Sequence, residues 1–183
     1  LTATPGRLDP DSPFPGSPTG GPTVVVTSHE LRIPDELYRV GVSATAVPWS
    51  RELPEVKAVS YLAATVARRT AREQGADEAL LTDAQGRILE GSSSNVFAVR
   101  SGVLVTPPVS AGLLAGGTRE VVLQAAGTEG IAAEERPLTV AELADADEAF
   151  LTATTREVVP LVRFAGRTIA TGRPGPVTEA LHE

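Results

Sequence analysis

Apolar and polar residues alternate over several short segments of the chain, a pattern typical of strands with one buried face. Glycine, serine and aspartate separate these segments, as at residues 83–86 and at Ser101-Gly102, where tight turns are expected. The predicted strands cover residues 23–28, 38–48, 78–82, 87–90, 94–100, 103–106 and 148–153, and residues 163–169 are predicted to form a β-turn between short strands.

Helical spacing appears in three places. After Lys57, apolar and small residues recur on one predicted face, and Gly75 is a plausible end; these residues are Val59, Leu62, Ala63, Val66 and Thr70. We therefore expect Lys57 at the start of that helix. Residues 118–126 form a second predicted helix, and Thr139 with Glu142 has the spacing of a capping box that opens a short third one. Hairpins mixed with helices predict an α+β fold.

The first 22 residues differ in composition from the rest. They hold six prolines and four glycines, which disfavour a helix or a central strand and predict a long loop. A strand over residues 23–28 and a linker over residues 29–35 are expected to follow. This stretch has neither a basic start nor an apolar core, so a signal peptide is not expected.

Composition narrows the function. The chain has 183 residues and a net charge of −7, so nucleic acid is not an expected partner. It has no run of 18 apolar residues, and a membrane span is not expected. The chain has no cysteine and two distant histidines, so we expect neither disulfides nor a metal site. A reducing cytoplasm is the expected location.

One lysine stands among 16 basic residues: Lys57, the other 15 being arginine. A primary amine can form a Schiff base, whereas a guanidinium cannot. A coding bias towards arginine, alanine and glycine would also explain a single surviving lysine. The count alone does not decide between these interpretations.

Three further segments carry candidate chemistry. Residues 90–95 join a carboxylate to Gly and three serines at a strand junction, which could also be a solvated turn. Gly116-Gly117-Thr118 precedes a helix and could bind an anion or be an ordinary cap. Residues 152–155 place hydroxyls at a strand end, where β-propensity alone would favour threonine. An amine, a carboxylate and a phosphate cradle are together the parts of a pyridoxal phosphate site.

The order of these segments resembles the class IV aminotransferases, the fold-type IV pyridoxal phosphate enzymes. The resemblance covers Lys57 and its helix, EGSSSNVF at 90–97, GGTREVVL at 116–123 and FLTATTREVVP at 150–160. It implies the larger C-terminal domain of such an enzyme, a mixed-sheet pseudo-barrel with flanking helices, over residues 36–183. Residues 1–28 would then be a remnant of the smaller N-terminal domain, most of which is missing, and residues 29–35 a linker.

The resemblance also assigns roles to residues. Lys57 would form the Schiff base with pyridoxal 5'-phosphate, and Glu90 would bind the pyridine nitrogen. Further matching positions lie beside the ring, pack on it or bind the phosphate: Ser93, Ser94 and Asn95 beside it, Leu114 packed on it, and Gly117, Thr118, Ala153 and Thr154 at the phosphate. At Ala153 the family often has serine, so one hydroxyl is lost.

The activity that the resemblance implies is amino transfer between an amino acid and a keto acid in a homodimer. The segments Lys-x-x-Ser-Tyr-Leu, EGSSSN and TATT are most similar to the D-amino acid aminotransferase group. That group binds the substrate carboxylate with an Arg and a His, whose positions fall near Pro10 and Ser12 in the loop at residues 8–15. D-amino acid specificity is therefore not carried over. Two alternatives stay open: an aminodeoxychorismate lyase that releases pyruvate and 4-aminobenzoate, and a truncated, catalytically silent fragment.

Overall fold

The structure is a computed structural model that describes residues 1–4, 6–7, 9–12 and 19–183. The chain forms two compact units, Leu1–Arg32 and Ile33–Glu183. In the first unit, strand β1 (Thr2–Thr4) pairs antiparallel with β2 (Thr23–Val25). The loop predicted for residues 1–22 is therefore wrong at residues 2–4, where two threonines favour a strand, and the strand predicted for residues 23–28 is shorter. The loop at residues 8–15, where the carboxylate-binding Arg and His of the D-amino acid group would fall, is described only in part: Leu8 and residues 13–15 lie outside the described residues.

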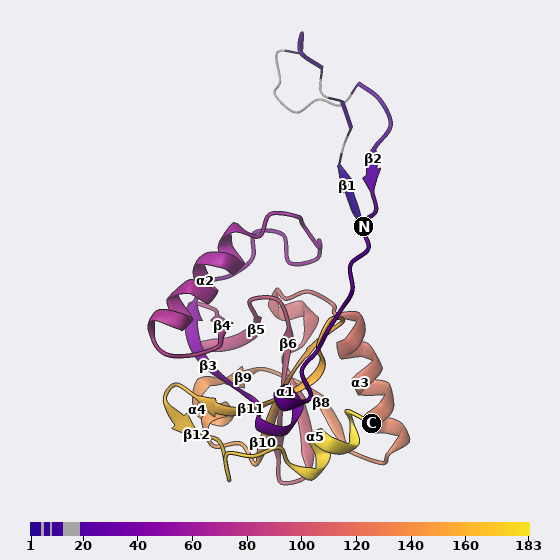
Figure 1. Ribbon diagram of the computed structural model, residues 1–183. Coiled ribbons are helices and arrows are strands. Elements are labelled where there is room, and N and C mark those ends of the chain that lie inside the picture. The colour runs from indigo at the N-terminus through magenta and orange to yellow at the C-terminus, as the bar shows by residue number, and fades with distance from the viewer. Residues whose placement is uncertain (5, 8, 13–18) are drawn as a thin grey trace. The chain divides into compact units, whose positions relative to one another are not determined.

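The second unit combines a large sheet with short helices (Figure 1). Its strands are β3 (Val42–Pro48), β4 (Glu78–Thr82), β5 (Arg87–Gly91), β6 (Asn95–Arg100), β7 (Val103–Thr106), β8 (Ala133–Glu135), β9 (Leu138–Thr139), β10 (Glu148–Ala153), β11 (Glu157–Phe164) and β12 (Arg167–Thr168). Its helices are α1 (Asp35–Val40), α2 (Leu62–Glu73), the 3-10 turn η1 (Val109–Ala111), α3 (Gly117–Thr128), α4 (Val140–Ala144) and α5 (Pro176–Ala180). This mixture confirms the predicted α+β fold.

The sheet is mixed and curled. Its hydrogen-bonded order is β8-β7-β6-β10-β11-β3-β4-β5-β9, with β12 beside β11, and β3 pairs in parallel with both β4 and β11. Four strands separate β5 from β6 in this order, which on a flat sheet is about 24 Å. Only residues 92–94 join these two strands, and they reach about 14 Å at most. The sheet must therefore curve back as in a half-barrel. Residues 92–94, here called the closing turn, join β5 to β6 across this curve.

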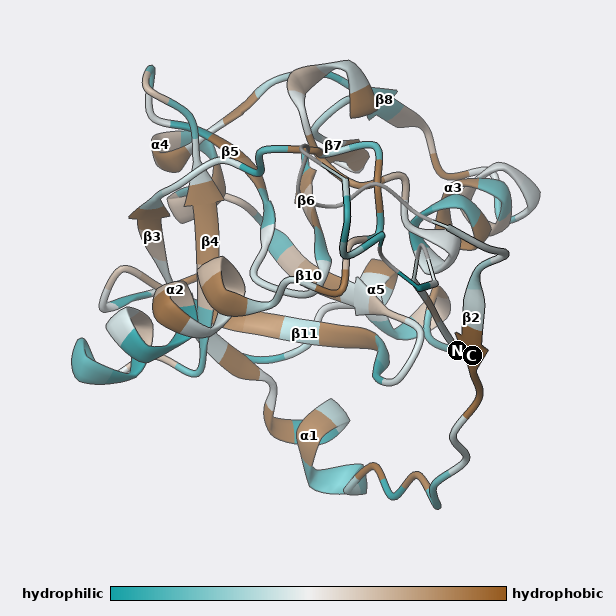
Figure 2. Ribbon diagram, turned by 90° about the horizontal axis from the view of Figure 1, so that it is seen from above, coloured by the Kyte–Doolittle hydropathy of each residue, from teal (hydrophilic) through white to brown (hydrophobic). Residues whose placement is uncertain are grey.

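Strand alternation divides the core between the two faces of the sheet. On β6, Val96 and Ala98 belong to the cluster inside the curl, whereas Phe97 and Val99 face the cluster under α3 and α5. Phe97 lies opposite Phe150 of β10, and their rings stack with centroids 5.0 Å apart. In Figure 2, β4 and much of β11 carry the hydrophobic colour. The period of two in the sequence therefore predicted these strands correctly, to within one residue, at 78–82, 87–90, 94–100, 103–106 and 148–153.

Helix α2 differs from its prediction. It begins at Leu62, five residues after Lys57, which lies instead in the preceding loop. Its buried residues are Ala67 and Ala71, which pack on the cluster beneath β3 and β4, whereas Leu62 is exposed. Alanines let the helix approach the sheet closely. The predicted apolar face is wrong because the larger residues on it, among them Val59 and Val66, point away from this core.

The strand predicted from residue 38 also begins too early. Residues 35–40 form α1, so the predicted linker ends before Asp35. Gly41 stops the helix with φ of 75°, and a Cβ there would lie 2.7 Å from the Val162 side chain. The Tyr38 ring contacts the His182 ring at an interplanar angle of 33°, with centroids 4.1 Å apart. These contacts with the C-terminal residues override the local strand pattern.

Two further predictions concern the helices after the sheet's closing turn. Helix α3 covers the predicted residues 118–126 and extends them at both ends. The capping box at Thr139 and Glu142 is confirmed, with both reciprocal hydrogen bonds present.

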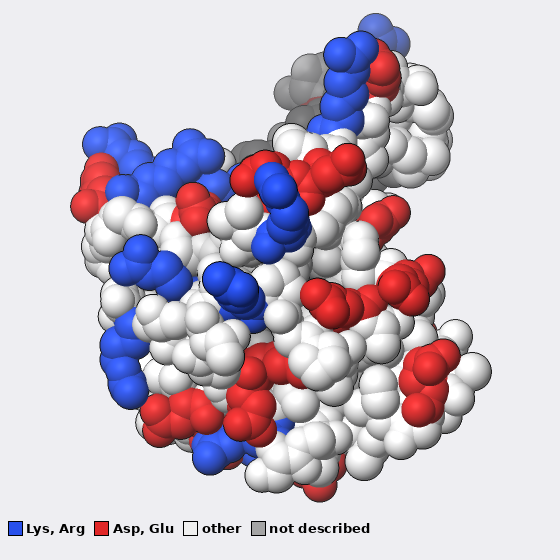
Figure 3. Space-filling model, turned by 60° about the horizontal axis from the view of Figure 1, so that its bottom comes forward, with Lys and Arg blue, Asp and Glu red and all other residues white. Residues whose placement is uncertain are grey.

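Among the helices that the structure describes, none has the length and apolar character needed to cross a bilayer. The face in Figure 3 carries basic and acidic side chains interspersed with each other.

Candidate active site

Glu90 is a buried carboxylate beside the closing turn of the sheet. It is 5% exposed, and its Oε2 accepts a hydrogen bond of 3.1 Å from the Leu114 backbone N–H. Its Oε1 lies 3.4 Å from Nη1 of Arg51. Burial raises the pKa of the Glu90 carboxyl above its usual range, and the Leu114 N–H, Arg51 and Lys57 oppose that rise. The site therefore holds a hydrogen-bond acceptor, the Glu90 carboxylate, in a poorly solvated position.

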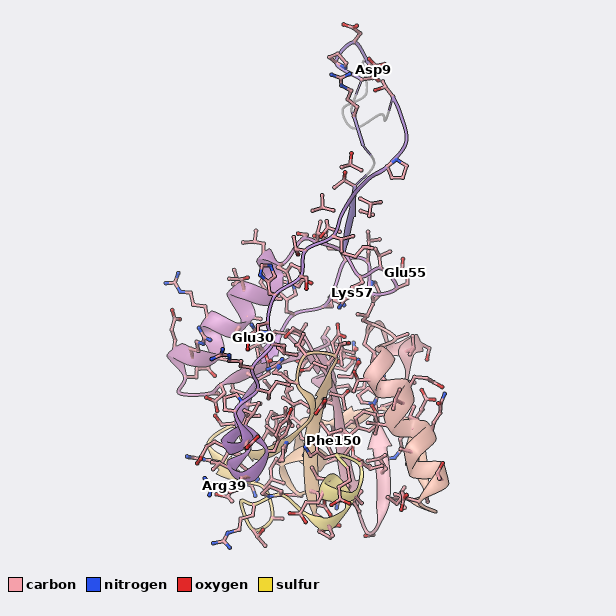
Figure 4. The ribbon with its side chains drawn as sticks, turned by 45° about the vertical axis from the view of Figure 1, so that its right-hand side comes forward. Asp9, Glu30, Arg39, Glu55, Lys57 and Phe150 are labelled. Carbon is pink, nitrogen blue, oxygen red and sulfur yellow. The ribbon has the colours of Figure 1, made fainter. Side chains whose placement is uncertain are left out.

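Lys57 lies on the loop that joins β3 to α2, over residues 49–61 (Figure 4). Its side chain is exposed, and its charge acts on the carboxyl of Glu90. Arg51 stands on the same loop, six residues earlier, and reaches the same carboxylate. The loop thus brings a primary amine and a guanidinium towards one buried anion.

Ser93, Ser94 and Asn95 occupy the closing turn and the start of β6. The Asn95 amide nitrogen donates to the Leu114 carbonyl at 2.9 Å. Ser94 is buried, and its Oγ is without a hydrogen-bond partner among the described residues. Gly91 faces this hydroxyl, and a Cβ added there would lie 2.1 Å from Ser94 Oγ. The turn is therefore tightly packed yet leaves one buried hydroxyl to be satisfied.

Leu114 and Gly116 to Thr118 form the approach to α3. Leu114 is half-buried, with its N–H on Glu90 and its carbonyl on Asn95. The helix has Gly116 as its N-cap, which provides no side-chain hydrogen bond, and Thr118 is half-buried in its first turn. Uncapped N–H groups at a helix start favour anions. Buried Arg119 fixes this end by donating to the Pro107 carbonyl at 3.0 Å.

Ala153 and Thr154 lie where β10 turns towards β11. The Arg156 N–H donates to the Ala153 carbonyl at 2.9 Å, which closes a tight turn and leaves Thr154 exposed. The preceding Thr152 pairs with Asn95 in the sheet register. Thr152 is 2% exposed, and its Oγ1 is a second buried hydroxyl without a partner among the described residues. Ala153 of β10 and Asn95 of β6, both predicted site residues, thus lie at the same end of two neighbouring strands.

Sequence reasoning missed four charged residues near the closing turn: Arg51, Arg68, Glu78 and Arg156. Glu78, buried at the start of β4, pairs with both Arg68 and Arg156. The only sequence signal for it is an acidic residue directly before the apolar run at 79–81. Nothing local in the sequence connects it with arginines 10 residues before and 78 residues after it. These partners meet through the curl of the sheet.

Known proteins with sequences similar to this chain are aminotransferases. The family described as amino-transferase class IV matches residues 1–164. The D-alanine aminotransferase of Bacillus licheniformis is 37% identical over 159 residues, 86% of this chain and 56% of that protein. The branched-chain-amino-acid aminotransferase of Pseudomonas aeruginosa is 42% identical over 124 residues, 68% of this chain and 40% of that protein. Relatives of both kinds are therefore about equally similar.

Solved structures show the same likeness in space. The T.th. branched-chain amino acid aminotransferase with pyridoxamine 5'-phosphate matches with a TM-score of 0.78 and 33% identity, over 84% of this chain and 52% of that chain. This chain spans about half the length of the curated relatives that it matches. The family match, the identities and the shared fold together show that the chain belongs to the class IV aminotransferase family.

Proposed function

We propose that this protein is a pyridoxal phosphate-dependent aminotransferase that moves an amino group between an amino acid and a keto acid. The observation that carries the proposal is the buried carboxylate of Glu90, which is acted on by the charge of the chain's single lysine. Membership of the class IV family supports the same reaction type.

The residues present fit this cofactor. Glu90 offers a buried acceptor for a protonated ring nitrogen, and Lys57 offers the amine for covalent attachment. The uncapped start of α3 suits a phosphate. The buried hydroxyls of Ser94 and Thr152 lack partners among the described residues, as expected where a polar ligand completes a site.

When bound, the cofactor supplies an electron-withdrawing ring that stabilises negative charge at the substrate Cα. Lys57 would hold it through Nζ, and the same amine, when free, would accept the Cα proton of the amino acid and deliver it to a carbon of the cofactor. Glu90 keeps a proton on the ring nitrogen, because its carboxylate can only accept from that position. Glu90 and Asn95 bind the backbone of Leu114, whose side chain would pack on the ring. Ser93 and Ser94 would line the ring's edge.

Phosphate binding falls to two turns. The N–H groups at Gly117 and Thr118 and the Thr118 hydroxyl belong to the first, and Ala153 with Thr154 to the second. A helix start gives both donors and a favourable dipole. Ala153 has no hydroxyl, so this proposal assigns the second turn's side-chain contact to Thr154 alone.

We also propose that the working enzyme is a homodimer. Large apolar side chains are exposed on and near the Lys57 loop, and such surface usually marks an interface; they are Trp49, Leu53, Val56, Tyr61 and Leu62. Sedimentation of the purified protein should give twice the mass of one chain. A monomer at concentrations that sustain activity contradicts this part of the proposal.

Borohydride reduction in the presence of pyridoxal phosphate, followed by peptide mapping, tests the proposal. The label is expected on Lys57 and should be lost in Lys57→Arg, which keeps the charge. Amino transfer is then assayed with L- and D-amino acids and a keto acid acceptor. Labelling elsewhere, or pyruvate release from aminodeoxychorismate without an acceptor, contradicts the proposed aminotransferase; the second result identifies the lyase instead.

A further inference from the structure

A buried ionic cluster lies behind the closing turn. Glu78, the first residue of β4, is 2% exposed. Its Oε1 accepts hydrogen bonds from the Ser92 hydroxyl and from the Ala79 N–H, the latter at 2.9 Å. Its Oε2 lies 3.4 Å from Nη2 of Arg156 and 3.7 Å from Nη2 of Arg68. Both oxygens of the carboxylate are thus engaged.

The two arginines also reach the closing turn directly. Nη2 of Arg68 donates to the hydroxyls of Ser92 at 2.8 Å and Ser93 at 2.6 Å. Nη2 of Arg156 donates to the same Ser93 hydroxyl at 3.1 Å. Ser93 therefore stands between two guanidinium groups, and the Glu78 carboxylate partly offsets their charge.

Four segments distant in sequence meet at this carboxylate: α2, the start of β4, the closing turn and the turn after β10. Arg156 closes the last of these, since its N–H bonds the Ala153 carbonyl. Its own carbonyl accepts from the Tyr38 hydroxyl at 3.3 Å. Arg156 is thereby held at its backbone and at its side chain. A displacement of the Arg156 backbone would therefore move the turn that bears Thr154.

We propose that Glu78 is a positioning residue that fixes the ring-side turn at Ser93 relative to the phosphate-side turn at Thr154. It does so through two arginines. Arg156 hydrogen-bonds to both turns, and Arg68 of α2 donates a hydrogen bond to Ser93. This inference rests on the proposed function, because the two turns matter together only if one ligand spans them.

Charge is essential to this role. A glutamine at residue 78 would keep the shape but leave two guanidinium groups facing each other without a counter-charge. Like charges at such short range repel each other, and no carboxylate would offset that repulsion. The arginines would then turn towards solvent, which their partial exposure of 35% and 33% allows, and Ser93 would lose both donors.

The test compares Glu78→Gln with Glu73→Gln by two readouts. Glu73 forms an exposed pair with Arg69 on the same helix as Arg68, so its variant is a matched control. The first readout is amide hydrogen exchange without cofactor: Glu78→Gln should speed exchange in both turns, at residues 92–95 and 153–156. The second is pyridoxal phosphate affinity by absorbance titration, which should weaken about tenfold. Glu73→Gln should change neither.

Arg156→Gln serves where Glu78→Gln fails to fold, since it leaves the pair of Glu78 with Arg68 in place. It should reproduce both effects, and where Glu78→Gln does fold, adding Arg156→Gln to it should change little. Unchanged exchange in both turns overturns the inference, as does faster exchange with unchanged cofactor affinity. If the unaltered protein and Lys57→Arg bind the cofactor alike, the proposed function itself fails. The exchange readout then still decides whether Glu78 couples the turns.

Discussion

The side-chain amide of Asn95 donates to the backbone carbonyl of Leu114 across 2.9 Å. This bond leaves no room beside it, because a Cβ on Gly116 would lie 2.0 Å from Asn95 Oδ1. The backbone of Gly116 has φ of −75°, an angle open to any residue. Glycine at this position is thus required by space and not by backbone conformation.

Gly116→Ala should therefore displace Asn95 and lower the free energy of unfolding by about 1–3 kcal/mol. Gly117→Ala is the matched control, since a Cβ there meets nothing within 4 Å and alanine favours a helix. Urea unfolding of both variants measures the difference. Equal stability of the two would show that the bond between Asn95 and Leu114 is not what excludes a side chain.

Glu90→Gln is expected to stabilise the cofactor-free protein near neutral pH. The folded state holds the Glu90 proton more tightly than the unfolded chain, because its pKa is raised from an ordinary 4.5. Stability therefore falls as the pH rises from about 4.5 through the raised pKa. The variant's higher melting temperature should disappear in acid, below that range. A pH-independent difference contradicts this origin.

The same substitution should slow amino transfer by about a hundredfold, a typical cost of losing one well-placed electrostatic contact. The variant stays folded, so the loss should appear in kcat and cannot be attributed to unfolding. Near-native turnover would remove Glu90 from the proposed reaction.

Glu142→Gln should behave in the opposite way. Hydrogen bonds from the Thr139 N–H and hydroxyl, with Arg136 nearby, lower the pKa of Glu142. This stabilisation is present above the ordinary pKa and is lost as the pH falls through the lowered one. The variant should be less stable by about 0.5–1 kcal/mol near neutral pH and equal to the parent in strong acid. Thermal melts across pH provide the measurement, and a deficit that persists in acid argues against the capping box.

Thr118→Val and Thr154→Val should each weaken pyridoxal phosphate binding about ten- to hundredfold, since a charge-assisted hydrogen bond contributes about 1.5–3 kcal/mol. Thr128→Val, at the far end of α3, is the control. Binding of pyridoxal without its phosphate should change little in any of them. Unchanged affinity for the phosphorylated form in both variants removes these two threonines from the site.

Sequence reasoning succeeded where local patterns decide the structure. The alternation at Val96 to Val99 and the capping box at Thr139 involve near neighbours, and both predictions are confirmed. It failed at Tyr38, whose contacts with His182 come from the other end of the chain, and on the face of α2, where packing chose Ala67 and Ala71 over larger residues. Glu78 and its arginines were missed because their pairing depends on the curl of the sheet. The roles assigned to Lys57, Glu90 and their neighbours stay predictions.

The short closing turn between β5 and β6 also has a consequence for the time at which the site can form. Its two strands are held in place by intervening strands that include β10 and β11, and β11 pairs with β3 more than 100 residues earlier. Pairings of such long sequence separation form slowly. During synthesis, a ribosome-bound chain that has exposed Lys57 and Glu90 still lacks the strands that bring the closing turn together. The site is therefore assembled late, only after β11 has emerged and paired.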